Sequence, residues 1–334
     1  MPTLKTEITE ITTGMAMLGY QGIDRALEVR PRHITHVSEA TFDRLDAARA
    51  AGEHDREFEI AWSNGNAFAR SELGLRGRPP WTLEWKGHHK PASKAIETIP
   101  ADLRIDHVYL ISCKYRSRIL HNSGPVSLFD HCLASTGSIQ RVNWFEAVAS
   151  EAFRAVWKPI YTAAGLPADI TPSLATKAQR ELVDDVLLES PIDTSSAPYV
   201  DFVNDASQSS AGRWRSSING RNGQSELFWR LLRMQAAPYF VLGQQHDLTP
   251  IQYRVSTPWD FAQNHSVVAF DVAAGFRGQP SVNWTASIAD RHGVIRTVHG
   301  YVEIRWSHGK LNGSPEAKVL LDTDPTLVPG YDAL

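Results

Sequence analysis

The chain has 334 residues, of which 42% are hydrophobic and 21% are charged, a composition typical of a globular protein with about two domains. Its 34 basic and 37 acidic side chains give a formal net charge of −3. This balance excludes a generally basic coat for nucleic acid and leaves only a local basic patch. The two cysteines, Cys113 and Cys132, exclude a disulfide-stapled scaffold and a cysteine-rich zinc module.

Targeting signals are not evident in the sequence. The first thirty residues lack the apolar core of a signal peptide, and no stretch approaches the ~18 apolar residues of a membrane span. We therefore expect a cytoplasmic protein without a membrane partner.

The first third of the chain predicts two helices followed by a strand. Residues 40–52 carry apolar side chains three apart, which indicates a short helix. Residues 57–71 predict a second helix, although Gly65 weakens its middle. Residues 74–80 (GLRGRPP) form a turn-rich connector, and residues 81–86 alternate like a strand.

Two further strands are expected at residues 102–106 and 109–115, joined by a tight turn near His107. In the first strand, Leu103 and Ile105 alternate with charged residues, as in a half-buried strand. The second strand is more continuously apolar, which is typical of a central strand.

The remainder of the chain predicts helices and then strands. Helical spacing is found in residues 123–133, 144–164, 174–188 and 226–235, with a serine-rich polar break between the last two, and strands begin at Tyr239. The predicted fold class is therefore α/β, a mixed central sheet flanked by helices, with a β-rich C-terminal part. We expect residues 1–235 to form the α/β core with a helical insertion. Residues 236–334 form the β-rich part, which can pack on the same core.

Residues 99–115 (IPADLRIDHVYLISCKY) carry the most informative chemistry. If the turn centres near His107, Asp102 lies across from Ser112, and Lys114 points to the same side as Ser112. A carboxylate at this position can hold a divalent metal through its oxygens. A neighbouring lysine can orient a water or stabilise a developing negative charge.

These residues resemble the PD-(D/E)xK nuclease superfamily, the fold of many restriction endonucleases. Residues 100–102 (Pro-Ala-Asp) resemble the proline–aspartate element with one residue inserted, and residues 112–114 (Ser-Cys-Lys) resemble the (D/E)xK element. The resemblance covers residues 57–120. It implies a restriction endonuclease-like core and a metal-dependent phosphodiesterase that cleaves DNA in restriction or defence, with RNA as an alternative substrate. Cutting both strands of a duplex would favour a homodimer.

The chain departs from this family at one position, because Ser112 stands where the family has an acidic metal ligand. The family's helix glutamate would match Glu59 or Glu57 on the predicted helix. Glu84 is the candidate substitute for the missing ligand, and Asp106 is the second possibility. The expected catalytic residues are Asp102, Lys114, Ser112, Glu59 and Glu84, of which Asp102, Glu59 and Glu84 would hold Mg²⁺ or Mn²⁺.

Arginines near the proposed site, and a later run in which arginine alternates with aromatic residues, favour contacts with nucleic acid. Guanidinium groups match phosphate oxygens, and each neutralised phosphate releases counterions. The arginines expected to bind DNA are Arg116, Arg118, Arg213, Arg215 and Arg221.

Other interpretations are open from the sequence. Ser112 also supports a catalytically degenerate nuclease fold that binds nucleic acid or protein. Asp102 and Lys114 could instead be an exposed pair on an edge hairpin. A third hypothesis is a metal-independent hydrolase in the β-rich part that uses His299 or His308. Motifs for zinc binding, for nucleotide binding and for a serine nucleophile elbow are not found.

Overall fold

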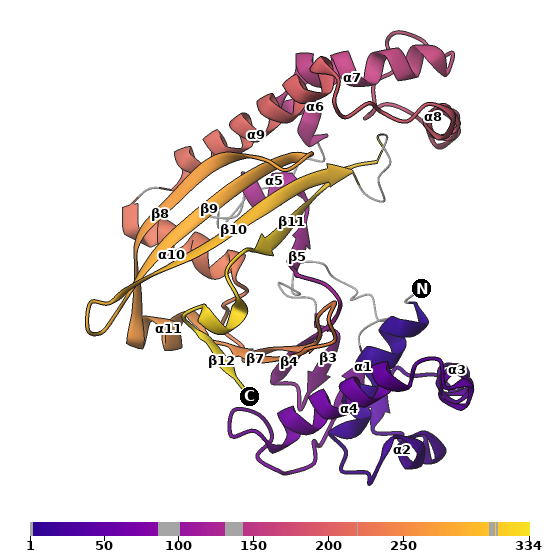
Figure 1. Ribbon diagram of the computed structural model, residues 1–334, viewed down its shortest axis with the longest axis vertical. Helices are drawn as coiled ribbons and strands as arrows, with labels where there is room; N and C mark the ends of the chain where they lie inside the picture. The colour runs from indigo at the N-terminus through magenta and orange to yellow at the C-terminus, as the bar shows by residue number, and fades with distance from the viewer. Residues whose placement is uncertain (1–2, 86–100, 131–142, 219, 307–310, 312) are drawn as a thin grey trace. The chain divides into compact units, whose positions relative to one another are not determined.

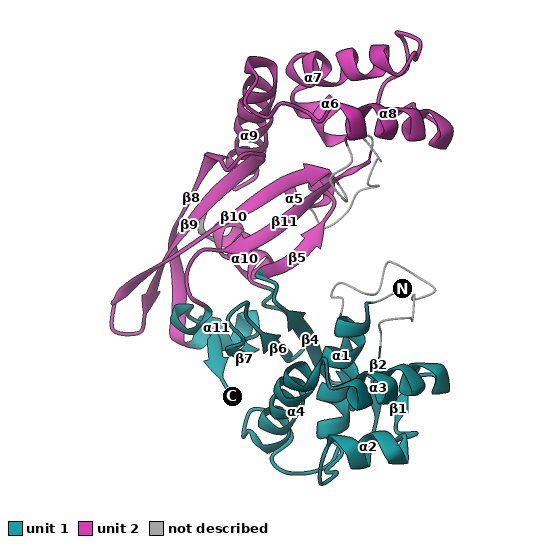
Figure 2. Cartoon of the chain, turned by 45° about the vertical axis from the view of Figure 1, so that its right-hand side comes forward, with its two compact units in different colours: residues 1–118, 233–263, 325–334 teal, residues 119–232, 264–324 magenta. Residues whose placement is uncertain are grey.

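The protein, seen here as a computed structural model, is described for residues 3–85, 101–130, 143–218, 220–306, 311 and 313–334 (Figure 1). It divides into two compact units, coloured separately in Figure 2. Unit 1 contains Met1–Arg118, Arg233–Gln263 and Pro325–Leu334, and unit 2 contains Ile119–Leu232 and Asn264–Asp324. The predicted α/β class is confirmed at this level. The expected boundary after residue 235 divides the chain differently, because the β-rich C-terminal part contributes strands to both units.

Unit 1 is built on a mixed seven-stranded sheet with the order β1-β2-β3-β4-β6-β7-β12. The pairs β1–β2 and β4–β6 are parallel, and the other pairs are antiparallel. The central position of β4 explains its continuously apolar sequence. The strands are β1 (Ile34–Thr35), β2 (Leu83–Trp85), β3 (Leu103–Ile105), β4 (Tyr109–Tyr115), β6 (Tyr239–Gln244), β7 (Pro250–Val255) and β12 (Tyr331–Ala333).

Helix α1 (Leu4–Ala16) packs against helix α4 (Asp55–Arg70), and both contact β4 or its neighbour β6. Gly65 of α4 allows this close approach, because a Cβ there would lie 2.2 Å from the Thr13 carbonyl oxygen. Thr13 Oγ1 also donates a hydrogen bond to the Ala61 carbonyl at 3.2 Å. The glycine that weakens the helix in isolation is therefore required by the packing. The other helices of this unit are α2 (Ile23–Val29), α3 (Glu39–Ala51) and α11 (Pro258–Asn264).

The core of unit 1 lies between this sheet and its helices. Alternate residues of the strands are buried in this core. Examples are Leu83 and Trp85 in β2, and Leu103 and Ile105 in β3. Each such side chain contributes on the order of 2 kcal/mol by leaving water. The core continues through Ile8, Ile11, Met15, Phe58, Phe68, Ile111, Phe240 and Leu242.

Unit 2 is built on an antiparallel five-stranded sheet with the order β5-β11-β10-β9-β8. Helix α9 packs on β8 and β9, and α7 packs on α9. An aromatic cluster of Phe145, Phe153, Phe202 and Trp306 fills the core. The elements are β5 (Ile119–Ser123), β8 (His265–Phe276), β9 (Pro280–Asp290), β10 (Ile295–Trp306), β11 (Pro315–Leu321), α5 (Pro125–Phe129), α6 (Trp144–Val148), α7 (Ser150–Ala163), α8 (Lys177–Glu189), α9 (Ala197–Ser217) and α10 (Gly220–Leu231).

The serine-rich segment, which the sequence predicts to be a break between two helices, instead forms most of helix α9. Ser207 and Ser210 are buried and donate hydrogen bonds to the carbonyls of Val203 and Ala206, each at 2.6 Å. The serine hydroxyls are therefore satisfied inside the helix, and the apolar residues between them supply the buried face. Among the described residues, no helix combines the length and the apolar character needed to cross a membrane.

Candidate functional site

Asp102 and Ser112 lie opposite each other in the β3–β4 hairpin, as the sequence predicts. The register pairs Leu103 with Ile111. The Asp102 amide donates to the Ile111 carbonyl at 2.8 Å, and the Cys113 amide donates to Asp102 Oδ2 at 2.6 Å. The left-handed residues Asp106 (φ 50°) and His107 (φ 60°) make the tight turn. Pro100, which precedes the motif, lies outside the described residues.

Lys114 lies near Asp102 and carries the complementary charge. Burial is the largest influence on Asp102 and raises its pKa, while Lys114, the Cys113 amide and the Ser112 hydroxyl offset part of that rise. Burial lowers the pKa of Lys114, and Asp102 opposes that change. Because β4 lies between β3 and β6 and both groups are partly buried, the interpretation as an exposed pair on an edge hairpin is wrong.

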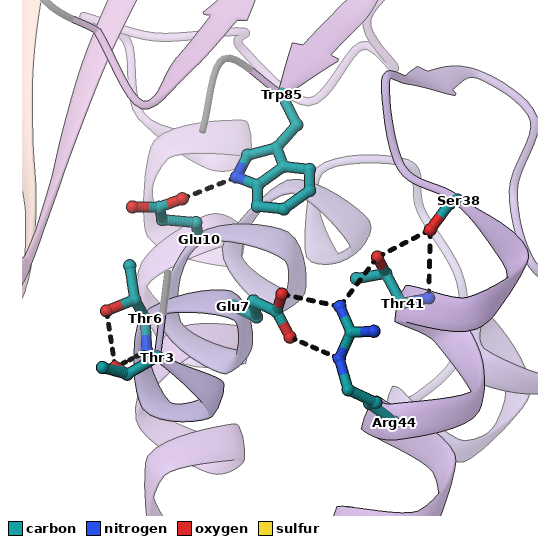
Figure 3. Close-up of polar contacts among 8 residues, drawn as sticks. All are labelled: Thr3, Thr6, Glu7, Glu10, Ser38, Thr41, Arg44 and Trp85. Carbon is teal, nitrogen blue, oxygen red and sulfur yellow. Dashed lines mark hydrogen bonds and ion pairs between the residues drawn. The ribbon is translucent and has the colours of Figure 1, made fainter. Parts of the chain in front are cut away.

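A second carboxylate, Glu10, lies near Asp102 on helix α1, which contacts β2 and β4. Trp85 Nε1 donates a hydrogen bond to Glu10 Oε2 at 2.5 Å (Figure 3). Trp85 pairs in the sheet with Leu103, the neighbour of Asp102. Burial and the charge of Asp102 raise the pKa of Glu10 to about 8. Glu10 and Asp102 therefore oppose each other's ionisation.

Glu7 anchors the helix that carries Glu10. The Arg44 guanidinium of α3 binds both Glu7 carboxylate oxygens, at 2.8 and 3.1 Å, and also donates to Thr41 Oγ1 (Figure 3). Ser38 caps α3 by accepting a hydrogen bond from the Thr41 amide. This bidentate pair joins α1 to α3 and fixes the helix face from which Glu10 extends.

Ser112, Tyr239 and Arg233 complete the cluster. Ser112 and Tyr239 are buried, and burial raises the pKa of the Tyr239 phenol. The Arg233 guanidinium lies 5.7 Å from the centre of the Tyr239 ring, and its charge lowers the pKa values of Asp102 and Lys114. Sequence reasoning placed Arg233 only in a run of arginines, because nothing local connects it to the hairpin.

The other acidic residues expected at the site are used elsewhere. Glu59 is exposed on α4. Glu84 binds Arg104, its partner in the β2–β3 register, through both carboxylate oxygens. Glu57 accepts a hydrogen bond from the Tyr115 hydroxyl at 3.2 Å. Glu10 of α1, which is not among the residues predicted for the site, is the glutamate whose pKa the charge of Asp102 raises.

Asp106, the second expected substitute, has a structural role. Its carboxylate accepts hydrogen bonds from the amides of Trp81 and Thr82 and pairs with Arg78 at 2.6 Å. Burial raises its pKa, but these partners outweigh burial and hold the pKa below its ordinary value. Asp106 therefore fixes the loop before β2 instead of facing Asp102.

The arginines expected to bind DNA are divided between the units. Arg116 lies in unit 1 with its guanidinium 5.3 Å from the Tyr115 ring centre, and Arg118 is exposed in the same unit. In unit 2, Arg213 pairs with Asp130 at 3.3 Å, and Arg215 is exposed. The side chain of Arg221 lies outside the described part of the structure.

The histidines of the hydrolase hypothesis are not shown to form a site. His299 is exposed, and its Nδ1 lies 3.1 Å from Thr285 Oγ1. His308 lies outside the described residues.

The side chains near Asp102 determine which ligands a metal ion would find there. Within the described ranges, no group of three or more His, Cys, Asp or Glu side chains is placed to hold a metal ion. The hairpin instead brings together Glu10 and Asp102, two oxygen donors whose raised pKa values a cation would lower again. Mg²⁺ is commonly held by one or two carboxylates together with substrate phosphates. The residues present therefore fit a cation that is shared with a phosphorylated substrate.

No protein-family model, no curated protein and no solved structure gives a significant match to this chain.

Proposed function

We propose that unit 1 is a metal-dependent phosphodiesterase that cleaves DNA, as the resemblance to the PD-(D/E)xK nucleases implies. The observation that carries this proposal is the meeting of Glu10, Asp102 and Lys114 at one hairpin of the central sheet. Glu10 on α1 takes the place that the resemblance gives to a helix glutamate. Two carboxylates and a lysine in a partly buried position are the groups that phosphodiester hydrolysis needs.

The roles of the residues follow from their surroundings. Glu10 and Asp102 would hold Mg²⁺ or Mn²⁺ through carboxylate oxygens, and the Cys113 amide and Ser112 hydroxyl hold the Asp102 carboxylate in place. The ion, when bound, lowers the pKa of a coordinated water and neutralises charge on the scissile phosphate.

Lys114 would orient the attacking water and stabilise the negative charge that develops on phosphorus oxygens. Because burial lowers its pKa, Lys114 loses its proton at a lower pH than an exposed lysine does.

The test is cleavage of a panel of plasmid, single-stranded and modified DNA, and of RNA, in Mg²⁺, Mn²⁺ or EDTA. We expect metal-dependent cleavage by the wild type, loss of cleavage in Asp102→Asn and Lys114→Ala, and retention in Glu59→Gln. Glu59 is the matched control because it is an exposed carboxylate of the same unit. Cleavage that survives in Asp102→Asn, or in EDTA, would reject the assignment.

A second candidate is a catalytically degenerate nuclease fold that binds nucleic acid or protein. The observation that favours it is Ser112, a buried residue without a carboxylate at the position where the resemblance implies an acidic metal ligand. In this case Mn²⁺ leaves the melting temperature unchanged, and DNA binding is the same with and without EDTA. A rise in melting temperature with Mn²⁺ that Asp102→Asn abolishes would exclude this candidate.

A further inference from the structure

A cavity of about 540 Å³ lies in unit 1 between the loop after α4 and the first residue of β4. Three arginines, Arg76, Arg78 and Arg254, line it together with Tyr109 and one acidic residue, Glu72. Tyr109 begins β4 and Lys114 is near its end, so five residues at ~3.3 Å each place the two about 16 Å apart along the strand. The cavity is thus distinct from the Glu10–Asp102 cluster and does not depend on the function proposed for that cluster.

Arg78 is held in place by a network within the loop that precedes β2. Its guanidinium pairs with Asp106 at 2.6 Å. Asp106 is itself fixed by the amides of Trp81 and Thr82, at 2.6 and 3.0 Å. The contacts of Arg78 with Asp106 and with the Pro79 carbonyl, at 3.4 Å, both involve Nη1, whereas the guanidinium carries five N–H donors. Arg78 is therefore pre-positioned with donors to spare.

Arg254 and Arg76 are held from the other sides of the cavity. Arg254 pairs with Asp260 at 2.8 Å. Arg76 Nε donates to the Glu72 carbonyl at 3.0 Å and lies 3.5 Å from the Glu72 carboxylate. The loop that carries Arg76 is tightly folded, because a Cβ at Gly74 would lie 2.1 Å from the Phe68 carbonyl oxygen. Three guanidinium groups therefore meet at one cavity on a defined backbone.

The walls of the cavity add apolar surface. The Tyr109 ring makes edge contacts with Phe68 and Phe240, at centroid distances of 5.7 and 5.9 Å, which fix its orientation. Leu73, Leu75 and Pro238 supply further apolar lining. The volume falls within the roughly 300–1,000 Å³ range of small-molecule sites.

We propose that this cavity binds a small molecule that carries a phosphate monoester, of the size of a nucleoside monophosphate. Guanidinium forks match phosphate oxygens in geometry as well as charge. The Tyr109 ring, Leu73 and Pro238 would contact the remainder of the ligand. Each of the three arginines also pairs with a carboxylate, Arg76 with Glu72, Arg78 with Asp106 and Arg254 with Asp260, so a phosphate would bind through their remaining N–H donors.

The test is isothermal titration of the full chain with AMP, inorganic phosphate and adenosine, in EDTA so that no metal contributes. We expect AMP to bind more tightly than phosphate, and adenosine to show no binding. Arg76→Met and Arg254→Met should each weaken AMP binding roughly tenfold or more, the effect of losing a charge-assisted hydrogen bond. The matched control is Arg25→Met, which removes another exposed, ion-paired arginine of unit 1.

AMP binding that both pocket variants retain, or no binding of AMP or phosphate at millimolar concentration, would overturn the proposal. Equal affinities for AMP and phosphate would support a phosphate site and reject the nucleoside contacts. Melting temperatures of all variants check that the fold is intact. Arg76 is the most informative position, because its side chain is 71% exposed and its removal leaves little to destabilise.

Discussion

At the scale of single residues, Glu10 is a carboxyl group whose charge depends strongly on the fold. Its pKa is raised to about 8 in the folded chain, whereas an unfolded chain has a glutamate pKa near ~4.3. Between these values the unfolded chain has lost the proton and the folded chain still holds it. The contribution of Glu10 to the free energy of unfolding therefore falls as the pH rises through this window, and that contribution changes no further above about pH 8.

Glu10→Gln removes this dependence and keeps an acceptor for Trp85 Nε1. In EDTA, we expect the variant to be more stable than the wild type at pH 8 by on the order of 1–3 kcal/mol, with the difference shrinking toward pH 5. Urea unfolding at pH 5, 6.5 and 8 measures it. The control is Glu28→Gln, an exposed glutamate on α2. If the free energies of unfolding of the wild type and of Glu10→Gln change in parallel with pH, Glu10 titrates normally and the prediction is wrong.

The same proton links metal binding to pH, if the proposed function holds. A cation that binds Glu10 below pH 8 must displace its proton, so Mn²⁺ affinity should rise about tenfold per pH unit between pH 6 and 7.5. Calorimetric titration in two buffers of different ionisation enthalpy counts the protons released. We expect close to one proton for the wild type at pH 6.5. A count that is unchanged in Glu10→Gln would assign the proton to another group.

The part of the site that could be predicted is the local part. Asp102, Ser112 and Lys114 lie on one hairpin, and a tight turn fixes the register of two antiparallel strands. Glu10 and Arg233 reach the hairpin from distant parts of the chain. The position of Glu10 depends on how α1 packs, and that of Arg233 depends on where β6 joins the sheet. Neither arrangement can be predicted from a local sequence pattern. Glu59 fitted the helix expected before the hairpin, but its position on that helix is exposed.

At the scale of elements, the contact between α1 and α4 determines where Glu10 lies. No helix is predicted over residues 4–16, a segment in which several threonines lower helix propensity. In the structure it is buried along most of its length, with Ile8, Ile11 and Met15 fully covered. Tertiary packing thus outweighs propensity here.

Gly65→Ala tests this packing. In an exposed helix the change would stabilise by up to ~1 kcal/mol. Here the added Cβ would lie 2.2 Å from the Thr13 carbonyl oxygen and 2.6 Å from Ala16 Cβ, so the two helices must separate. We expect a loss of about 1–3 kcal/mol in the free energy of unfolding, and reduced cleavage because Glu10 moves with α1.

The matched control for this variant is Gly212→Ala in α9. A Cβ at Gly212 meets no atom within 4 Å, so helix propensity alone should act and the variant should be equal to the wild type or more stable. Denaturant midpoints of both variants give the comparison. A stabilised Gly65→Ala chain would show that α1 and α4 are farther apart than described.

At the scale of the whole molecule, the chain passes between the two units four times, so neither unit is a continuous segment. The α/β class could be predicted, because periodicity identifies most helices and strands locally. The division could not be predicted. The strands after residue 236 have similar patterns, yet β6, β7 and β12 join unit 1 whereas β8–β11 form the sheet of unit 2. Sheet membership depends on long-range pairing, such as that of β6 with β4.

The arginines expected to bind DNA are distributed over both units, and this distribution gives the last prediction. If DNA contacts both units, Arg118→Met and Arg215→Met should each weaken binding and each reduce the slope of log affinity against log salt by about 0.9, the value for one lost phosphate contact. Both side chains are exposed, so little stability should be lost. Fluorescence anisotropy with a short duplex in EDTA, between 50 and 200 mM salt, measures the slopes, with Arg25→Met as the control.

An effect confined to Arg118 would restrict the DNA interface to unit 1 and leave unit 2 with another role. Unchanged slopes in both variants would remove these arginines from the interface, even if cleavage at Asp102 is established.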